Sequence, residues 1–311
     1  MSNSQSIKDT LLSASAQLKT EEAKLEAQLL LQHALNVNHV WLIANQDENL
    51  APSIHEAYKA LLQRRLNGEP IAYILGYREF YGLNLKVSAD TLIPRADTET
   101  LVETALAKIP FMVRQAHHER NISNSARPEP VEGHTHSQHT ILDLGTGTGA
   151  ITLAIAKHRP EAYVTALDAS QAALDIAIEN AGNLNILNVK FILSDWFSAL
   201  NQDNIKQKFD VIVSNPPYIE ADDVHLKQGD LRYEPISALA SGTEGLDAIR
   251  HIIKNAPPHL NPYGWLMLEH GYNQASKVAA LLKQAGFSDI SHAKDLSGID
   301  RVTIGRFQVG A

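Results

Sequence analysis

The fold of this chain is decided by an apolar stretch that ends in a stiff polar turn, Val211-Ile212-Val213-Ser214-Asn215-Pro216-Pro217-Tyr218. The run 209–213 is short, β-branched and apolar on both faces, which indicates a buried strand of a parallel sheet. Neither proline has an N–H group, and Pro216 keeps Asn215 out of the helical conformation, so the strand ends here. The turn presents fixed acceptors, which are the side chain of Asn215 and the carbonyls of Asn215 and Pro216, beside the flat ring of Tyr218. We predict a cradle for a planar group with N–H donors, such as a carboxamide or a base amine; the alternative is a strand-ending turn with a buried tyrosine.

Strands and helices alternate on both sides of this stretch, from residue 140 to residue 307. We expect strands at 141–144, 164–167, 189–193, 209–213, 265–268, 289–292 and 301–307, and helices through Ala154, from Gln171 and around 278–282. Such alternation produces a parallel sheet with helices on both of its faces. The sequence therefore predicts an α/β fold with a doubly wound, mostly parallel, seven-stranded sheet.

A glycine-rich turn follows the first of these strands, Asp143-Leu144-Gly145-Thr146-Gly147-Thr148-Gly149. Its glycines allow the backbone to approach a ligand closely where the strand meets the next helix. A dinucleotide site would have the spacing G-x-G-x-x-G and would bind a pyrophosphate at the helix N-terminus. Here the third glycine comes one residue early and the acidic Asp143 precedes the motif. Both features favour a ligand with an amino group and no phosphate.

The following strands also end in groups that suit a nucleoside. Asp168 ends the second strand, where a carboxylate accepts hydrogen bonds from both ribose hydroxyls; the alternative is that it caps the helix from Gln171. Asp195 and Trp196 close the third strand and offer an acceptor for an adenine amine and a ring that stacks on its face. Because the carboxyl ends of parallel strands meet at one edge, Asn215 would lie beside them. The joint pattern predicts a site for S-adenosylmethionine, with a substrate nitrogen held at the fourth strand.

The N-terminal part of the chain has a helical pattern. From residue 7 to residue 66 the apolar residues recur at helical spacing, a helix start follows Thr20, and Pro52 stands near the first turn of the last helix. We predict a small helical bundle at 1–68. A separate helical cap on an enzyme favours recognition of a partner over a role in stability alone.

The pattern becomes extended from residue 69 to residue 96, with apolar residues at Ile71, Tyr73 and Leu75 and turn residues at Gly76 and Gly82. This predicts a β-hairpin linker. The α/β domain then spans 97–311, and its first helix is expected to be capped by Asp97 or Thr98.

Residues 110–139 fit none of these patterns. The segment contains Pro128, Pro130 and five histidines and has no apolar periodicity, so we predict a disordered insertion. The histidine spacing matches no ligand template, and we expect no metal site. The strings at 112–120 and 125–133 resemble a translated palindromic repeat, an element inserted in frame in some bacterial genes, which implies a bacterial source.

The composition limits the class of protein. The 311 residues carry 27 Lys and Arg against 35 Asp and Glu, a formal net charge of −8, which argues against stable nucleic-acid binding through phosphate contacts. No cysteine is present, which excludes disulfides, thiolate metal sites and a cysteine nucleophile. No segment has the length of a membrane span and the first residues lack an apolar signal core. We expect a cytoplasmic monomer without membrane contact.

The motifs together resemble the HemK/PrmC family, the protein-glutamine methyltransferases that act on peptide chain release factors. The resemblance covers the chain except the segment 110–139, and it includes three further motifs, Ile93-Pro94-Arg95 with Thr98-Glu99, Tyr233-Glu234-Pro235 and Arg301-Val302-Thr303. It implies a Rossmann-like methyltransferase domain, S-adenosylmethionine as cofactor, and methylation of the glutamine in the Gly-Gly-Gln loop of release factors. Ala96 departs from the family pattern, which usually has a second proline at this position.

The resemblance also implies a role for each motif residue. Cofactor contacts are expected from Asp143, Leu144, Gly145, Thr146, Gly147, Asp168, Asp195, Trp196 and Asn215. Substrate contacts are expected from Arg95, Asn215, Pro216, Pro217 and Tyr218, of which Asn215, Pro216 and Tyr218 are the catalytic candidates. The mechanism that we infer is direct in-line displacement by the glutamine amide nitrogen, which the acceptors at Asn215 and Pro216 orient, without a general base.

Two other classes of function stay open at this point. A nucleic-acid amino methyltransferase would use the same four-residue cradle for a flipped base, and the acidic charge and the helical front domain argue against it. A noncatalytic protein that binds S-adenosylmethionine is the third class. The presence of every expected chemical group argues against that class.

Overall fold

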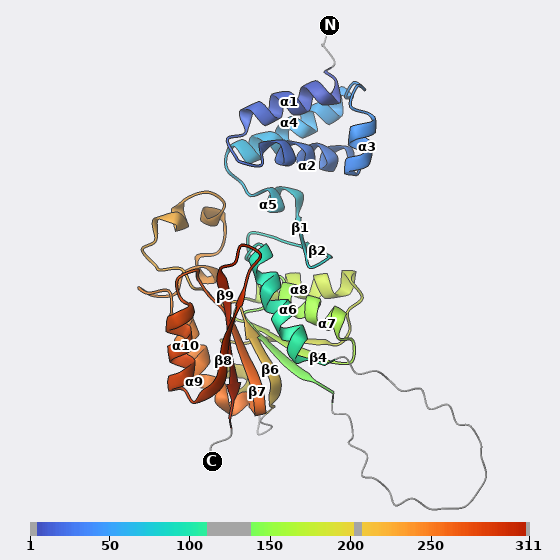
Figure 1. The fold of residues 1–311 in the computed structure, drawn as a ribbon. Helices are drawn as coiled ribbons and strands as arrows, with labels where there is room; N and C mark the ends of the chain where they lie inside the picture. Colours follow the sequence, from blue (N-terminus) through green and yellow to red (C-terminus); the bar gives the residue numbers. More distant parts are fainter. Residues whose placement is uncertain (1–4, 111–137, 202–206, 309–311) are drawn as a thin grey trace, which may run out of the picture.

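The computed structural model describes residues 5–110, 138–201 and 207–308. Figure 1 shows a helical domain at the top, a short hairpin below it, and an α/β domain that contains the rest of the described chain. The predicted insertion at 110–139 lies, apart from its ends, outside the described residues. Within the described ranges, no helix combines the length and the apolar character that a membrane crossing requires.

The N-terminal domain is a bundle, as predicted from the helical spacing. Its helices are α1 (Ile7–Gln17), α2 (Ala23–Leu35), α3 (His39–Ala44) and α4 (Pro52–Leu66). Pro52 occupies the first turn of α4, where a missing N–H group costs nothing. The side chain of Tyr58 is buried at the centre of the bundle, and its hydroxyl donates to the carbonyl of Ala27 at 3.2 Å.

The linker departs from its prediction in one part. The hairpin forms, with β1 (Tyr77–Phe80) paired antiparallel to β2 (Leu83–Lys86), but the stretch Ile71–Leu75, predicted to be extended, forms the short helix α5. Pro70 precedes this helix, and Gly76 ends it in the left-handed conformation at φ 81°. Five residues are too few to separate an alternating from a helical period, and the flanking Pro and Gly were the better signal.

The α/β domain contains the predicted seven-stranded sheet. Its strands are β3 (Thr140–Leu144), β4 (Tyr163–Asp168), β5 (Val189–Leu193), β6 (Phe209–Ser214), β7 (Leu260–Glu269), β8 (Phe287–Lys294) and β9 (Asp300–Phe307). Their order is β5-β4-β3-β6-β7-β9-β8, and all pairs are parallel except those of β9 with β7 and β8. From β3 to β5 each new strand is added on one side of the sheet, and β6 is then added on the other side of β3. Sheets of this type bind ligands at the point where the order of strands reverses.

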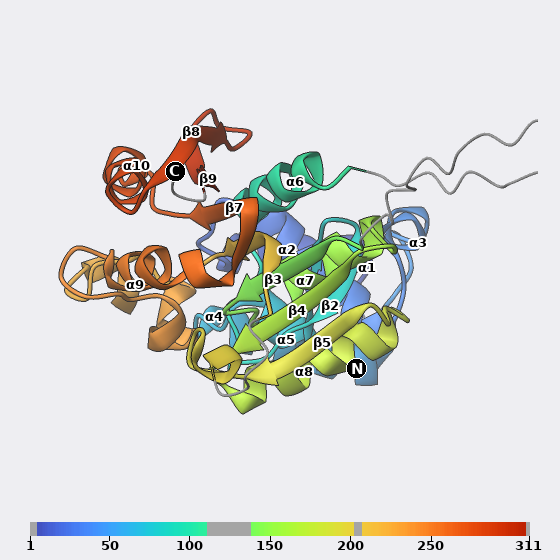
Figure 2. The ribbon, with the colours of Figure 1, turned by 90° about the horizontal axis from the view of Figure 1, so that it is seen from below.

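Helices cover both faces of the sheet. They are α6 (Glu99–Lys108), α7 (Ala150–His158), α8 (Gln171–Asn183), α9 (Asp247–Asn255) and α10 (Ala275–Gln284). Figure 2 shows α6 and α7 on one side and α9 and α10 on the other, and each side has its own apolar core. The sequence analysis missed α9, although Ile249, Ile252 and Ile253 recur at helical spacing and all three are buried.

The start of α6 also differs from its prediction. A 3₁₀ turn, η1 (Ala96–Thr98), precedes the helix, and no side chain caps it. Asp97 instead forms an ion pair with Arg301 of β9 at 3.0 Å, and the hydroxyl of Thr98 faces Asn215. These two side chains are therefore engaged in tertiary contacts, which sequence spacing does not show.

Candidate active site

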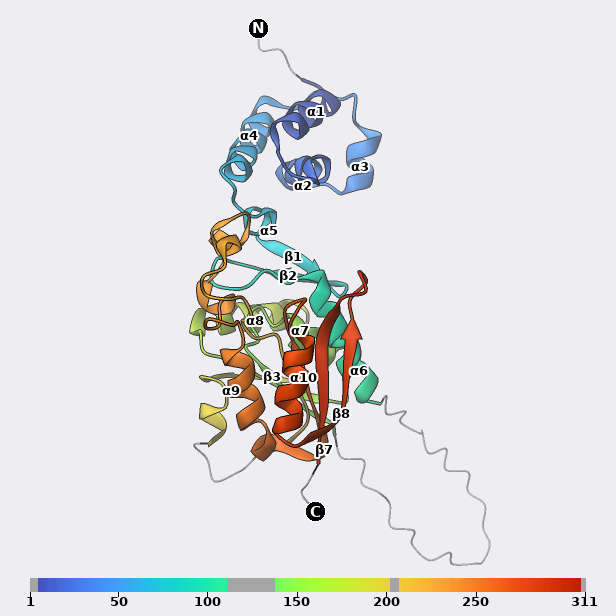
Figure 3. The same cartoon turned by 60° about the vertical axis from the view of Figure 1, so that its left-hand side comes forward.

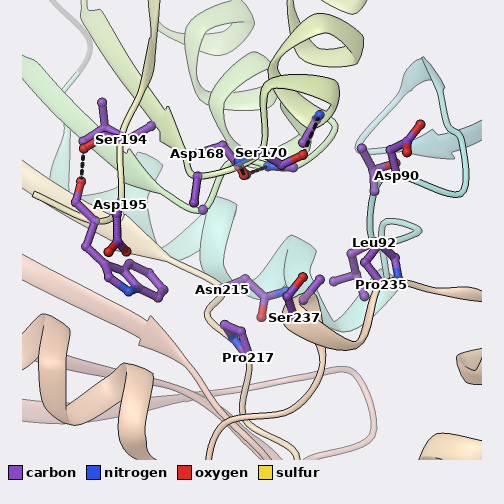
Figure 4. A pocket seen from close by; sticks show the side chains of 18 of the residues that line it. Asp90, Leu92, Asp168, Ser170, Ser194, Asp195, Asn215, Pro217, Pro235 and Ser237 are labelled. Atoms are coloured by element: carbon purple, nitrogen blue, oxygen red, sulfur yellow. Dashed lines mark hydrogen bonds between the residues drawn. The ribbon is translucent and has the colours of Figure 1, made fainter. Parts of the chain in front are cut away.

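A cavity of about 570 Å³ lies at the carboxyl edge of the sheet. Four successive parallel strands supply one wall, through Gly145 and Gly147, Asp168, Asp195 with Trp196, and Asn215 with Pro217. Leu92 and Pro235 form part of the opposite wall (Figure 4). The predicted convergence of the strand ends is therefore present, and the volume suits a nucleoside-sized ligand.

The glycine-rich turn leaves open space in front of it. Gly145 and Gly147 have positive φ angles of 75° and 55°, and a Cβ atom on either would meet no protein atom within 4 Å. The N–H groups of Gly145 and Thr146 both donate to the carbonyl of Leu167, at 2.8 and 2.9 Å, which fixes the turn to β4. The turn is a rigid cradle whose concave side faces the cavity.

Asp143 and Leu144 lie behind this turn and not in the cavity wall. Asp143 is fully buried, and its Oδ2 accepts hydrogen bonds from the hydroxyls of Thr146 and Thr152 at 2.8 and 2.7 Å. Burial raises the pKa of Asp143 to about 6. Its Oδ1 has no hydrogen-bond partner among the described residues, so it retains the capacity for one more donor. The arrangement supports the shape of the turn, and a direct contact of Asp143 with a ligand stays a prediction.

Asp168 combines a structural role with a place in the cavity wall. Its Oδ2 accepts from the N–H of Gly147 at 2.8 Å, and its Oδ1 accepts from the N–H of Ser170 at 2.9 Å. Ser170, and not Asp168, caps α8 by accepting from the N–H of Ala173. Each carboxylate oxygen has two lone pairs, so both can still accept a hydrogen bond from a ligand hydroxyl.

Asp195 and Trp196 form the part of the wall beyond β5. The backbone of Trp196 has a positive φ of 48°, an uncommon conformation for a bulky residue, and its carbonyl accepts from the hydroxyl of Ser194 at 2.6 Å. Asp195, which is labelled in Figure 4, and Trp196 both line the cavity. The pair places an acceptor and a flat apolar side chain in the cavity lining, and their contact with a cofactor stays a prediction.

The turn after β6 divides its residues between the cavity and the core. Asn215 and Pro217 line the cavity, whereas Pro216 is buried. The Nδ2 group of Asn215 donates to the hydroxyl of Thr98 at 3.1 Å, and its Oδ1 accepts no hydrogen bond from the part of the chain that the structure describes. Tyr218 packs against the core on the α9 and α10 side, and its hydroxyl donates to Oε1 of Glu269 at 3.4 Å. Asn215 and Pro217 therefore line the cavity wall, and Tyr218 is not among the residues that line it.

Arg95 lies at the end of the cavity nearest the glycine-rich turn. A hollow of about 40 Å³ there is lined by Arg95, Thr98 and Asn215, among others. Arg95 forms an ion pair with Glu234, which also accepts from the N–H of Ile93 at 2.9 Å. Two motifs far apart in the sequence are thus joined at the cavity rim. Within the described residues no group of three or more His, Cys, Asp or Glu side chains is arranged to hold a metal ion.

Sequence reasoning missed two buried groups that contact the turn after β6. The hydroxyl of Thr98 accepts from Asn215, and the carboxyl of Glu269 accepts from Tyr218. Glu269 ends β7 in the same way that Asp168 ends β4, so an acidic residue after an apolar strand was a usable signal. The sequence analysis gives Thr98 as a possible helix cap and as part of a family motif, and not as a partner of Asn215. Its contact with Asn215 joins residues 117 positions apart, and local spacing does not predict such a contact.

Comparison with known proteins assigns both domains. Residues 9–76 match the family described as PrmC N-terminal domain, and residues 135–290 match the family described as Methyltransferase domain. The chain is 45% identical over 283 residues to the release factor glutamine methyltransferase of Xylella fastidiosa, which covers 91% of this chain and 93% of that protein. It is 41% identical to the protein of the same name from Escherichia coli, with coverage of 96% and 97%.

The fold is also similar to that of a solved structure. The hMettl16 catalytic domain, solved with the MAT2A 3'UTR hairpin 6, has a TM-score of 0.52 to this chain at 14% identity, over 81% of this chain and 82% of that one. At this identity the likeness concerns the methyltransferase fold alone. The two relatives cover more than nine tenths of the chain at over 40% identity, including the helical domain and the sheet. The chain therefore belongs to the family of S-adenosylmethionine-dependent release factor glutamine methyltransferases.

Proposed function

We propose that this protein transfers a methyl group from S-adenosylmethionine, directly and in line, to the side-chain amide nitrogen of the glutamine in the Gly-Gly-Gln loop of peptide chain release factors. The observation that carries the proposal is the free Oδ1 of Asn215 in the cavity wall, which is an acceptor aimed at a planar N–H donor. The names of the relatives, release factor glutamine methyltransferase, identify the same kind of substrate.

The residues of the cavity fit the cofactor. The carboxylates of Asp168 and Asp195 would accept from ribose hydroxyls and an adenine amine, and the indole of Trp196 would cover the base. The open space before Gly145 and Gly147 would admit the amino-acid end of the molecule. When bound, S-adenosylmethionine supplies an electrophilic methyl group on a positively charged sulfur.

The protein groups in the turn after β6 would make the amide nitrogen reactive. An amide nitrogen is a poor nucleophile because its lone pair is shared with the carbonyl group. Acceptors at the Asn215 side chain and the Pro216 carbonyl bind its N–H groups, orient the lone pair and stabilise the positive charge that develops on nitrogen. A general base is not needed, because the alkylated amide is acidic and releases its proton to water.

The experiment that tests the proposal measures transfer of a labelled methyl group to four acceptors in parallel. These are a purified release factor, the same factor with the loop glutamine changed to alanine, DNA and RNA. We expect label on the intact factor only. Equal labelling of the glutamine-to-alanine factor would refute glutamine as the acceptor, and efficient labelling of a base amine would establish the nucleic-acid alternative.

The variant Asn215→Ala tests the role of the acceptor. Loss of one oriented hydrogen bond in the transition state raises the barrier by about 2 to 4 kcal/mol. We expect slow single-turnover methyl transfer with nearly unchanged affinity for S-adenosylmethionine in calorimetry. A folded variant that transfers the methyl group at the normal rate would contradict this role.

A further inference from the structure

The cavity wall opposite the strand ends consists of two connecting segments, residues 89–92 and residues 235–238, which together we name the loop wall. Figure 4 shows Leu92 of the first segment and Pro235 of the second across the cavity from Asp195. Neither segment belongs to the sheet. The hydrogen bonds of the sheet therefore do not fix the loop wall, and other contacts must hold it in place.

Glu234, which directly precedes the second segment, joins the two halves of the loop wall. Its side chain is fully buried. Oε2 accepts from the N–H of Ile93 at 2.9 Å, and Oε1 accepts from Nη2 of Arg95 in an ion pair. Among the residues that the structure describes, no other hydrogen bond connects residues 89–95 with residues 230–238. The carboxylate of one residue thus holds the two halves together.

The two bonds of Glu234 fix a side chain as well as a backbone. A buried carboxylate is stable only when its oxygens are hydrogen-bonded, and here a backbone N–H and a guanidinium satisfy both of them. Arg95 lines the hollow that also contains Asn215. The same carboxylate therefore determines the position of the loop wall and the direction of a cation beside the acceptor of the substrate.

The surroundings of Glu234 indicate that its loss would displace the loop wall without unfolding the domain. The side chain of Arg95 is 34% exposed, so without its partner the guanidinium can be hydrated. Ile93 is also held by apolar packing against Ala72 and Val87. A role in position can therefore be measured separately from a role in stability.

We propose that Glu234 is a positioning residue that fixes the loop wall at one distance from the strand ends and directs Arg95 toward the substrate, an inference that rests on the proposed function. The position of the loop wall sets how closely the substrate amide is confined beside Asn215. Glu234 does not line the cavity, so it acts through Ile93 and Arg95.

The variants Glu234→Gln and Glu234→Ala separate the two bonds. Glutamine retains an oxygen for the N–H of Ile93 and loses the charge that pairs with Arg95, whereas alanine loses both bonds. In Glu234→Gln we expect the KM for the release factor to rise by roughly tenfold, with kcat at saturation and the affinity for S-adenosylmethionine nearly unchanged. In Glu234→Ala, KM should rise further and kcat should fall, because the wall no longer confines the amide.

Glu179→Ala is the matched control for both variants. Glu179 also pairs with the linker, through Lys86 at 2.7 Å, but this pair is exposed and lies outside the cavity lining. An exposed pair contributes little, so KM and kcat should be normal. A normal KM in folded Glu234→Ala, or a rise of KM that Glu179→Ala reproduces, would overturn the proposal.

A second measurement does not depend on activity. The chain has no cysteine, so cysteines introduced by Asp90→Cys and Ile236→Cys can be spin-labelled specifically, and both positions are exposed. We expect a narrow distribution of distances between the two labels, a similar one with Glu234→Gln, and a broader one with Glu234→Ala. A distribution that Glu234→Ala does not change would overturn the proposal. A broadened distribution in an enzyme whose wild type fails to label the release factor would refute only the proposed function.

Discussion

Single side chains in the cavity wall serve the fold and the site together, and Asp168 is the clearest example. Its two oxygens hold the N–H groups of Gly147 and Ser170, so it fixes both the glycine-rich turn and the start of α8. The same oxygens face the cavity. A substitution at this position therefore affects ligand contact and loop geometry at once.

The variant Asp168→Ala should weaken binding of S-adenosylmethionine in calorimetry. Each hydrogen bond to a charged group contributes about 1.5 to 3 kcal/mol, and the loss of the carboxylate removes such bonds to the ligand. Asp175→Ala is the control, since Asp175 is exposed on α8 and, among the residues that the structure describes, its side chain accepts a hydrogen bond from Gln171 alone. Unchanged affinity in Asp168→Ala would limit this carboxylate to a structural role.

The buried carboxyl of Glu269 should make stability depend on pH. Burial raises its pKa from 4.5 to about 7, so between these values the unfolded chain releases a proton that the folded protein keeps. The free energy of unfolding should therefore fall as the pH rises through this range. Glu269→Gln should raise the melting temperature at pH 8 and change it little at pH 4. A lower melting temperature at pH 8 would show that the charge stabilises the fold.

Several of these residues were predictable because their positions are local. Asp168, Asp195 and Asn215 each follow an apolar strand, and parallel strands bring their carboxyl ends together without further information. The contacts of Thr98 with Asn215 and of Glu269 with Tyr218 were not predictable, because they arise from packing between segments far apart in the sequence.

At the scale of elements, the segment that follows the turn after β6 folds back on that turn. Gly245 has a φ of 67°, and a Cβ atom there would lie 2.2 Å from the carbonyl oxygen of Tyr218. Gln274 donates to the same carbonyl at 3.0 Å. The backbone of the turn after β6 is thus held by a close approach that only glycine permits.

The variant Gly245→Ala should lower both the melting temperature and kcat, because the new methyl group displaces the backbone of Tyr218. The matched control is Gly286→Ala, where φ is 84° but no atom lies within 4 Å of the added Cβ. The free energy of unfolding of the control should fall only by the cost of the left-handed conformation, about 1 kcal/mol, and its kcat should be normal. Equal changes of melting temperature and of kcat in the two variants would show that the close approach at Gly245 is unimportant.

The sequence predicted the helices and strands correctly where the periodic pattern was long, and incorrectly where it was short. The strands at 141–144 and 164–167 lie within β3 and β4, whose apolar runs are bounded by clear turns. The stretch Ile71–Leu75 is helical because Pro70 and Gly76 set its ends, and α9 was overlooked between two irregular segments. In these two places the turn residues and the packing determine the helical conformation, and the alternation of apolar side chains does not.

At the scale of the whole molecule, the helical domain and the cavity are connected through one segment. Arg65 of α4 forms ion pairs with Glu26 of α2 at 2.8 Å and with Asp230 at 2.9 Å. The carbonyl of Asn67 accepts from Arg232 and from the hydroxyl of Tyr233. Figure 3 shows this segment beside α5, and its continuation through Pro235 reaches the cavity wall.

The variant Arg65→Ala should loosen this connection. The loss of one partner from a largely buried ion pair costs about 3 kcal/mol, because Glu26 is left without compensation. We expect a lower melting temperature and a higher KM for the release factor, with kcat at saturation nearly unchanged. Arg64→Ala is the control, since its pair with Glu69 is more exposed and contributes little. Equal changes in the two variants would argue against a role of the connection in placing the substrate.

The division into domains followed from changes of pattern along the sequence, whereas the attachment of the helical domain did not. The contact between Arg65 and Asp230 joins residues 165 positions apart, and either side chain would suit a solvated surface equally well. Such contacts depend on the complete fold. The sequence therefore predicted the domains, and it did not predict the contacts between them.

The position of β9 determines when the protein becomes competent during its own synthesis. The ribosome produces β7 and β8 before β9, yet β9 lies between them and is hydrogen-bonded to both. A nascent chain that ends before β9 has an unpaired, apolar β7 edge, which is a template for aggregation. It also lacks Arg301, which forms an ion pair with Asp97 of η1. The last strand to be synthesised thus both pairs with the β7 edge and supplies a contact to the segment that lies against Asn215.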